Sequence, residues 1–303
     1  MRPQTTLARA VHTTGIGLHT GTPVELTIFP APPDTGYVFR RADLNGFELS
    51  ATPHHVAHVS YATTLMRKGV MVSTVEHLLS ALHGCQVDNA IIELNSFEVP
   101  ILDGSALPFV ELIEAASVVE LPAIRQTLRI LRSVEIIDGA RRIAIHPYQG
   151  FRIESTIDFP HPVIGRQTSA LDLTPENYRR EIAPARTFGF IHEAEALRKS
   201  GLVRGASLEN AVVLDKEKVL NPEPLRFSDE FGRHKVLDIV GDLALLGMPI
   251  EGRIVAERSG HGLHSALMAK LIRETDAWEV TEADVDLPAI LAANGLFREA
   301  VRA

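Results

Sequence analysis

The residues best suited to chemistry lie in two short segments that are far apart in the chain. One contains the pair Glu76 and His77, and the other contains His234 and Asp238, with Asp242 one helical turn further along. Two imidazoles and one carboxylate match the three protein ligands that a catalytic zinc ion commonly takes, leaving its fourth position for water whose pKa falls to about 7. Because one carboxylate stays free to accept a proton, the combination indicates metal-dependent hydrolysis.

The first segment is expected to be helical, with Glu76 and His77 lying off its buried side. A capping box is an alternative explanation of Glu76, because in Ser73-x-x-Glu76 the glutamate can return a hydrogen bond to the cap residue. A solitary helical histidine such as His77 is more typical of a packed or surface residue than of a ligand. The apolar residues recur at i, i+3, i+4 and i+7 and indicate one buried stripe: Val75, Leu78, Leu79 and Leu82.

The second segment is also expected to be a helix, which places His234, Asp238 and Asp242 on one face at steps of four residues. Such a polar row along a mostly apolar helix is costly to bury unless something pairs with it. A divalent metal ion would satisfy the row. An exposed His/Asp pair, worth a few tenths of a kcal/mol, is the alternative, and the spacing alone leaves both open.

Composition limits the class of protein. The chain has 303 residues, of which 45% are hydrophobic and 22% charged, and this suits one large or two medium globular domains. The formal net charge is -8, so a phosphate backbone would be repelled and no nucleic-acid partner is expected.

Three features of the sequence bear on where the protein works. The single cysteine, Cys85, cannot form an internal disulfide. The N-terminus lacks the apolar run of a signal peptide, and no stretch approaches the roughly 20 consecutive apolar residues needed to cross a bilayer. We therefore expect a cytoplasmic protein with at most peripheral membrane contact.

A faint internal repeat indicates that the two halves of the chain are built alike. Aligning Gly84 with Gly247 brings the strand-like Ile91 onto Ile254, so that each half contains a helix, a glycine and a strand. Strands that alternate apolar and polar residues, as several here do, are typical of antiparallel, half-buried sheets. The sequence therefore predicts the α+β class, with two similar two-layer α/β sandwich domains and the active site between them.

The boundary between these domains is expected just after residue 124. The N-terminal domain, residues 1–124, then carries Glu76 and His77, and the C-terminal domain, residues 125–303, carries the second segment. Each half has a distinct long insertion, at residues 53–72 and at about residues 186–215. Loops of that size usually carry function.

At this point the chain resembles the UDP-3-O-acyl-N-acetylglucosamine deacetylases, zinc enzymes that catalyse the committed step of lipid A synthesis in Gram-negative bacteria. The resemblance runs over essentially the full length. The motifs that carry it, in order, are Thr14-Gly-Ile-Gly-Leu-His19-Thr-Gly, Ser73-Thr-Val-Glu-His-Leu-Leu-Ser-Ala-Leu, Ile101-Leu-Asp103-Gly-Ser, Ala185-Arg-Thr187-Phe-Gly-Phe, His234-Lys-Val-Leu-Asp-Ile-Val-Gly-Asp242-Leu and Ser259-Gly-His261.

The resemblance implies a metal centre with one Zn2+ per chain. His77, His234 and Asp238 match the family's zinc ligands. Glu76 matches the general base, and a place near a helix N-terminus favours its ionised form. Whether the native metal is zinc or iron is not determined by the sequence.

The resemblance also implies three further catalytic residues. Thr187 matches a residue whose hydroxyl stabilises the developing oxyanion together with zinc. His261, expected on a loop between two glycines, matches the histidine that protonates the departing amine, and Asp242 is expected to orient it. Taken alone, Thr187 is one threonine among many, and His261 is more typical of an ordinary loop histidine.

Substrate contacts are expected at several positions by resemblance. Lys235 matches a lysine near the sugar and diphosphate, and Phe159 an aromatic residue against the uracil ring. Arg258 stands where related enzymes have lysine, which leaves its diphosphate role open. His19 follows a tight hairpin that is expected to bring it toward the site. A surface Lys235 and a core Phe159 are the simpler alternatives from sequence alone.

An acyl-binding role is expected for the insertion at residues 186–215. Its βαβ pattern and amphipathic helix are consistent with an apolar passage lined by four residues: Phe188, Ile191, Ala194 and Leu197. Burial contributes about 0.8 kcal/mol per methylene, so roughly ten methylenes would supply about 8 kcal/mol. A packed core within the insertion is an equal alternative.

These observations predict hydrolysis of the N-acetyl group of an acylated UDP-sugar by a monomeric zinc amidase. Another zinc amidohydrolase or peptidase with an apolar pocket is the alternative, and a non-catalytic binding module is a third. The acyl-chain length, the rate-limiting step and the oligomeric state are not determined by the sequence.

Overall fold

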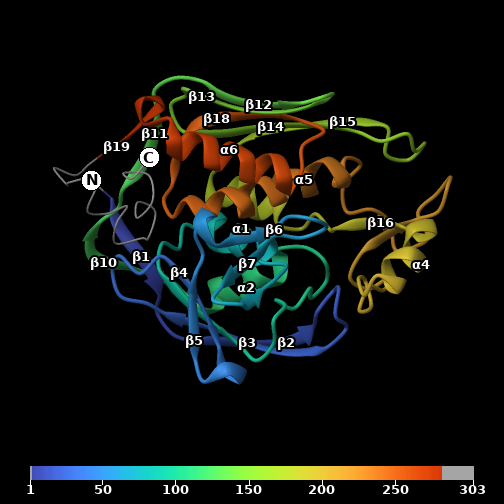
Figure 1. Ribbon diagram of the computed structural model, residues 1–303, viewed down its shortest axis with the longest axis horizontal. Helices are drawn as coiled ribbons and strands as arrows, with labels where there is room; N and C mark the ends of the chain where they lie inside the picture. The colour runs from blue at the N-terminus through green and yellow to red at the C-terminus, as the bar shows by residue number, and fades with distance from the viewer. Residues whose placement is uncertain (1, 282–303) are drawn as a thin grey trace.

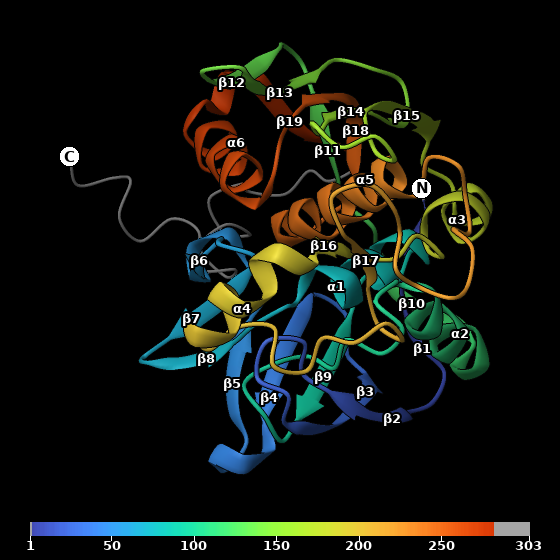
Figure 2. The same ribbon diagram turned by 90° about the vertical axis from the view of Figure 1, so that its right-hand side faces the viewer.

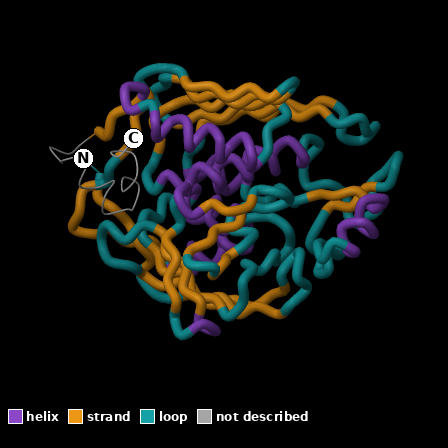
Figure 3. Tube along the Cα trace, viewed as in Figure 1, coloured by secondary structure: helices purple, strands orange, loops and turns teal. Residues whose placement is uncertain are grey.

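The computed structural model describes residues 2–281, and its mixture of helices and strands confirms the α+β class. Figure 1 shows two sheets on opposite sides of the molecule with helices between them. The same order of layers, sheet, helices, helices, sheet, is visible along the Cα trace in Figure 3. The end of the predicted C-terminal domain, residues 282–303, lies outside the described residues.

The N-terminal half forms a five-stranded sheet in the order β2-β3-β9-β4-β5, with β9 at its centre. β9 runs antiparallel to β3 and parallel to β4. The elements of this half are β1 (Pro3–Leu7), β2 (Val11–Ile16), β3 (Pro23–Pro30), β4 (Tyr37–Arg41), β5 (Phe47–Ser50), β6 (Val56–His58), β7 (Thr64–Arg67), β8 (Val70–Val72), α1 (Glu76–Gly84), β9 (Ala90–Leu94), α2 (Leu107–Ala116) and β10 (Val118–Ile124).

The C-terminal half forms a seven-stranded sheet around β18. β18 runs parallel to β11 and β14 and antiparallel to β13. The elements are β11 (Thr127–Ile130), β12 (Val134–Asp138), β13 (Arg141–His146), β14 (Phe151–Asp158), β15 (Arg166–Asp172), α3 (Pro175–Asn177), β16 (Phe188–Phe190), α4 (Ile191–Lys199), β17 (Val212–Leu214), α5 (Glu230–Leu243), β18 (Ile250–Glu257), α6 (His261–Arg273) and β19 (Trp278–Thr281).

The two insertions contain regular structure. Residues 53–72 include the small antiparallel sheet β6-β7-β8. Residues 186–215 include β16, α4 and β17, and the two strands pair in parallel, as the βαβ pattern predicts. Figure 1 shows β16 and α4 at one end of the molecule, and Figure 2 turns that end toward the viewer.

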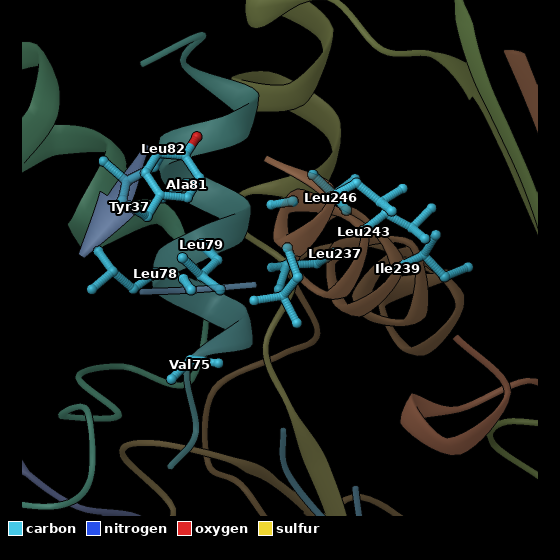
Figure 4. Close-up of a cluster of buried hydrophobic side chains, with 14 of the residues drawn as sticks. Tyr37, Val75, Leu78, Leu79, Ala81, Leu82, Leu237, Ile239, Leu243 and Leu246 are labelled. Atoms are coloured by element: carbon cyan, nitrogen blue, oxygen red, sulfur yellow. The ribbon is translucent and has the colours of Figure 1, made fainter. Parts of the chain in front are cut away.

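Helices α1 and α5 pack against each other in the middle of the molecule, and their apolar side chains join the cores of the two halves (Figure 4). The predicted stripe of α1 is fully buried. From α5, Leu237, Ile239 and Leu243 are each at most 1% exposed. The site residues carried by these two helices therefore lie beside a continuous core.

The two halves share the predicted order of a helix followed by a strand, but their strands align differently from the predicted residue pairing. In each half a helix is followed by the central strand of a sheet: α1 by β9, and α5 by β18. However, Ile92 rather than Ile91 shares the fully buried side with Ile254. Since side chains alternate along a strand, a shift of one residue exchanges the faces, and the proposed alignment was one residue out.

Within residues 2–281, no helix has the length and apolar character required to cross a bilayer.

Candidate active site

The packing of α1 against α5 brings His77 together with His234 and Asp238. The ligand atoms of the three side chains lie within 4.8 Å of one another. Nε2 of His234 is 3.3 Å, and Nε2 of His77 is 3.9 Å, from Oδ1 of Asp238. All three residues are at most 4% exposed. Two imidazole nitrogens and a carboxylate oxygen that converge in this way form a candidate metal-binding group.

The protonation states of this group suit metal binding. Burial lowers the pKa of His77 to about 3 and also lowers the pKa of His234, so both rings are neutral. Nδ1 of His234 donates to the carbonyl oxygen of Ala185 at 3.1 Å, which leaves the Nε2 lone pair free. Burial acts to raise the pKa of Asp238, but the positive charges of Lys235 and of protonated His261 outweigh it and hold that pKa well below its usual range.

Close contact of the two helices depends on Gly241 of α5. A Cβ at this position would lie 2.0 Å from the carbonyl oxygen of Glu76. Only glycine therefore lets the backbone of α5 approach the first turn of α1 so closely, and that approach sets the distance from His77 to His234 and Asp238.

Glu76 is the first residue of α1 and is 3% exposed. Its Oε2 accepts a hydrogen bond from the backbone N–H of Thr63 at 3.0 Å. The capping-box alternative is wrong: Val75 is the N-cap, no side-chain cap bond forms, and Ser73 bonds to Thr64 instead. Burial raises the pKa of Glu76 to about 7, although His261 opposes the rise. Burial thus outweighs the expected effect of the helix N-terminus.

His261 begins α6, so its predicted place on a loop is wrong; Gly260 is the N-cap of that helix. Nδ1 of His261 lies 2.7 Å from Oδ2 of Asp242, and its Nε2 lies 3.9 Å from Oε1 of Glu76. Burial acts to lower the pKa of His261, but the Asp242 carboxylate outweighs it and raises that pKa to about 10. Asp242 therefore holds a protonated imidazole beside Glu76.

His264 is a site residue that was not identified from the sequence. Its Nδ1 lies 2.6 Å from Oδ2 of Asp242, and its Nε2 lies 3.0 Å from Oγ of Ser259. Thr63 donates its hydroxyl hydrogen to the other carboxylate oxygen of Asp242 at 2.6 Å. Asp242, His261 and His264 also lie close enough to hold an ion, but hydrogen bonds from both rings already account for their arrangement. The i, i+3 spacing of the two histidines was the available signal.

Phe188 and Phe159 form an aromatic wall beside the candidate metal-binding group. The Phe188 ring lies 6.4 Å from the ring of His234 and 5.6 Å, edge on, from Phe159. Nζ of Lys235 lies 5.6 Å from the Phe188 ring centre and donates to Oδ2 of Asp238 at 2.7 Å. The structure therefore places Lys235 and Phe188 beside His234 and Asp238, and Phe159 packs against Phe188.

Thr187 directly precedes Phe188 and is half-buried. Its backbone N–H donates to the carbonyl oxygen of Gly104, and its carbonyl oxygen accepts from Val212, both at 2.8 Å. Thr187 is thus held between the two halves, next to the residues of the aromatic wall.

Arg258 and His19 are engaged with protein groups outside the metal-binding group. Nη2 of Arg258 donates to Oδ2 of Asp158 at 2.6 Å, and the side chain is 41% exposed. The hairpin brings His19 to the insertion, where its Nδ1 accepts the N–H of Val203 at 3.4 Å. Nε2 of His19 is buried and has no hydrogen-bond partner among residues 2–281.

Helix α4, which carries three of the predicted acyl-binding residues, lies at the end of the molecule that faces the viewer in Figure 2. Ile191 is 47% exposed, whereas Ala194 and Leu197 are half-buried and share one side of the helix. A cavity of about 580 Å³ lies at the C-terminal end of α1, away from Glu76 and His77, and its lining includes His83. None of the predicted site residues lines this cavity.

Fold and site together define a class of protein. An α+β enzyme with two neutral imidazoles and an ionised carboxylate at one point, and a spare carboxylate and a charged imidazole beside them, is built as a metal-dependent hydrolase.

Comparison with known proteins identifies the family. A family model described as UDP-3-O-acyl N-acetylglycosamine deacetylase matches residues 4–273. The chain is 49% identical over 284 residues to the UDP-3-O-acyl-N-acetylglucosamine deacetylase of Solibacter usitatus, covering 94% of this chain and 96% of that protein. It is 48% identical over 289 residues to the enzyme of the same name from Saccharophagus degradans, covering 94% and 95%. The chain belongs to this family and is a hydrolase of the deacetylase type, which confirms the resemblance noted in the sequence.

Proposed function

We propose that the chain hydrolyses the N-acetyl group of UDP-3-O-acyl-N-acetylglucosamine, giving acetate and UDP-3-O-acyl-glucosamine, with one zinc ion per chain. Membership of the family supports this substrate and a role in lipid A biosynthesis. The observation that carries the mechanism is the convergence of His77 from α1 with His234 and Asp238 from α5, beside the carboxylate of Glu76.

The donor set suits zinc. When bound by His77, His234 and Asp238, zinc supplies Lewis-acid polarisation of the amide carbonyl and makes water acidic enough to ionise near neutral pH. Lys235 keeps Asp238 ionised, and Ala185 fixes the ring of His234 in the tautomer with Nε2 unprotonated.

Glu76 acts as the general base. Among residues 2–281, its carboxylate accepts a single hydrogen bond, from the backbone N–H of Thr63 to Oε2, so Oε1 is available to take a proton from the attacking water. A pKa of about 7 leaves a large ionised fraction at neutral pH and suits a group that must both accept and release a proton.

His261 acts as the general acid. The Asp242 carboxylate keeps its imidazole protonated, and Nε2 points the proton toward the side where Glu76 lies. The proton passes to the amine as the C–N bond breaks. The hydroxyl of Thr187 is assigned to the oxyanion of the tetrahedral intermediate.

Substrate binding is assigned to two regions. Lys235, Phe159 and Arg258 face the sugar nucleotide, with His19 at the edge of the insertion. Phe188 and the α4 residues Ile191, Ala194 and Leu197 receive the acyl chain. This division is supported by the aromatic wall next to His234 and by the half-buried side of α4.

The proposal includes three further predictions from the sequence. They are a domain boundary between residues 124 and 125, a monomeric state and a cytoplasmic location.

An acetate-release assay tests the function. Purified protein is assayed for zinc by elemental analysis and for acetate release from UDP-3-O-acyl-N-acetylglucosamine and from the same sugar nucleotide without its acyl chain. We expect one zinc per chain and much faster release from the acylated compound. Equal rates on both compounds would favour the broader zinc amidohydrolase, and no acetate from either would reject the function.

A further inference from the structure

A short segment of backbone, residues 184–187, lies along one face of α5. The carbonyl oxygen of Ala185 accepts the Nδ1 hydrogen of His234 at 3.1 Å. The next residue, Arg186, donates its backbone N–H to Oε1 of Glu230 at 3.0 Å. Glu230 and His234 are four residues apart and so share a face of the helix. Two successive residues of the segment are thus attached to successive turns of α5.

The side chain of Arg186 binds the same carboxylate. Its Nε donates to Oε1 of Glu230 at 2.8 Å, and its Nη2 donates to Oε2 at 3.2 Å. Arg226 adds its backbone N–H to Oε2 at 2.7 Å. The carboxylate accepts four hydrogen bonds, and the side chains of Arg186 and Glu230 are 5% and 0% exposed. Every acceptor position of this buried carboxylate is therefore filled.

We propose that the buried pair Arg186 and Glu230 is a positioning pair for the reaction. It fixes the backbone on either side of residue 186, and in this way it holds the carbonyl of Ala185 against His234 and sets where the Thr187 hydroxyl stands. This inference rests on the proposed function, which gives His234 and Thr187 their roles.

Stability alone is a poor reason for such a pair. Buried ion pairs are often no more stabilising than apolar residues of the same volume, because desolvation offsets the attraction. Here the main-chain and side-chain nitrogens of one residue bind a single carboxylate oxygen. That geometry restrains the orientation of the peptide, and a lysine cannot reproduce it because it lacks the planar fork.

A double-mutant cycle with Thr187→Ala tests the pair. Arg186→Lys keeps the charge, and we expect kcat to fall by about 10- to 100-fold with KM within about threefold of wild type. In the Thr187→Ala background the same substitution should lower kcat by a clearly smaller factor, because one of the two groups that it positions is already absent and only its effect through His234 remains. Equal losses of kcat in both backgrounds, or a folded Arg186→Lys enzyme with normal kcat, would overturn the proposal.

Arg41 offers a matched control. It forms a two-pronged pair with Asp43 and donates to the carbonyl oxygen of Met71 at 2.7 Å, and its side chain is 9% exposed. Arg41→Lys therefore removes a similar fork outside the site. Arg41→Lys should leave kcat unchanged. If it lowered kcat as much as Arg186→Lys does, the loss would reflect general destabilisation of the fold, and the inference would be rejected.

A readout that needs no activity separates this inference from the proposed function. In the metal-free protein, 15N chemical shifts of the His234 ring report which nitrogen carries the proton. We expect Nδ1–H in wild type and in Arg41→Lys, and a mixture of tautomers in Arg186→Lys. If the His234 spectrum of Arg186→Lys matches that of wild type, the positioning role of the pair is rejected. If that spectrum changes but the wild-type protein releases no acetate, only the proposed function is rejected. If Arg186→Lys does not fold, Glu230→Gln is measured in the same way, because it keeps one oxygen for Arg186 and loses the charge.

Discussion

We predict that Gly241→Ala weakens zinc binding, because it forces α1 and α5 apart. The new Cβ would lie 2.0 Å from the carbonyl oxygen of Glu76, 2.7 Å from its carbonyl carbon and 3.0 Å from its Cα. All three atoms are backbone, so no rotamer change relieves the clash. Restoring an ordinary contact of 3.4 Å requires the two helices to separate by 3.4 − 2.0 = 1.4 Å at this point.

This separation acts directly on the metal-binding group, because His77 follows Glu76 and Asp238 precedes Gly241 by one turn of α5. A misplacement of about 1 Å costs on the order of 10²-fold in rate, and a loss of zinc affinity of about 10- to 100-fold is expected from disturbed ligand geometry. Stability should change less: overpacking costs about 1–3 kcal/mol, and alanine regains about 1 kcal/mol of helix propensity over glycine.

Zinc affinity is measured by competition with a chromophoric chelator, and stability by urea unfolding of the metal-free protein. Gly232→Ala is the control, since it adds the same methyl group to the same helix, but its nearest neighbour is the rotatable hydroxyl of Ser169 at 2.8 Å. Zinc affinity of Gly241→Ala within about threefold of Gly232→Ala would refute the reasoning that this contact sets the ligand distances.

Three further predictions follow from the site and the core. Glu76→Ala should retain zinc by elemental analysis while kcat falls by at least about 10²-fold, and near-normal turnover would remove Glu76 as the base. His234→Ala should abolish tight zinc binding in the chelator assay, so wild-type affinity would reject the ligand set. Burial lowers the pKa of His83 to about 4, with Arg125 adding to the shift, so between about pH 6.5 and 4 the unfolded chain binds a proton that the folded chain refuses. Stability should therefore fall as pH drops through this window, by up to about 3 kcal/mol, and urea unfolding of His83→Gln should lack that part of the decline; parallel pH curves for the two proteins would contradict the assignment.

The helical spacing of the sequence predicted which polar side chains of α5 lie on one side of the helix, for a physical reason. A helix of 3.6 residues per turn places His234, Asp238 and Asp242 on one side, and a buried polar row needs partners. The structure supplies those partners: the carbonyl of Ala185 for His234, Lys235 for Asp238 and His261 for Asp242. The stripe of α1 that begins at Val75 is buried as predicted, because apolar periodicity reports which side of a helix faces a core.

Local patterns failed where a tertiary contact competed with them. Ser73 and Glu76 have capping-box spacing, yet the Glu76 carboxylate turns to the N–H of Thr63 in the first insertion. Sequence patterns do not identify His264 as a site residue, because its partner, Asp242, is 22 residues away in sequence and on another helix. The repeat alignment also failed by one residue, since similar apolar residues occupy both faces of these central strands.

The sequence by itself determined the fold class and the family and indicated the candidate site residues, because periodicity, residue type and motif order are properties of the chain. Only the tertiary structure decided how these residues are arranged. It showed that Gly241 lets α1 meet α5, that burial raises the pKa of Glu76 while Asp242 raises that of His261, and that the Glu230 carboxylate accepts the backbone N–H of Arg186. Distances, desolvation and hydrogen-bond partners depend on residues from distant parts of the chain, and no local pattern contains them.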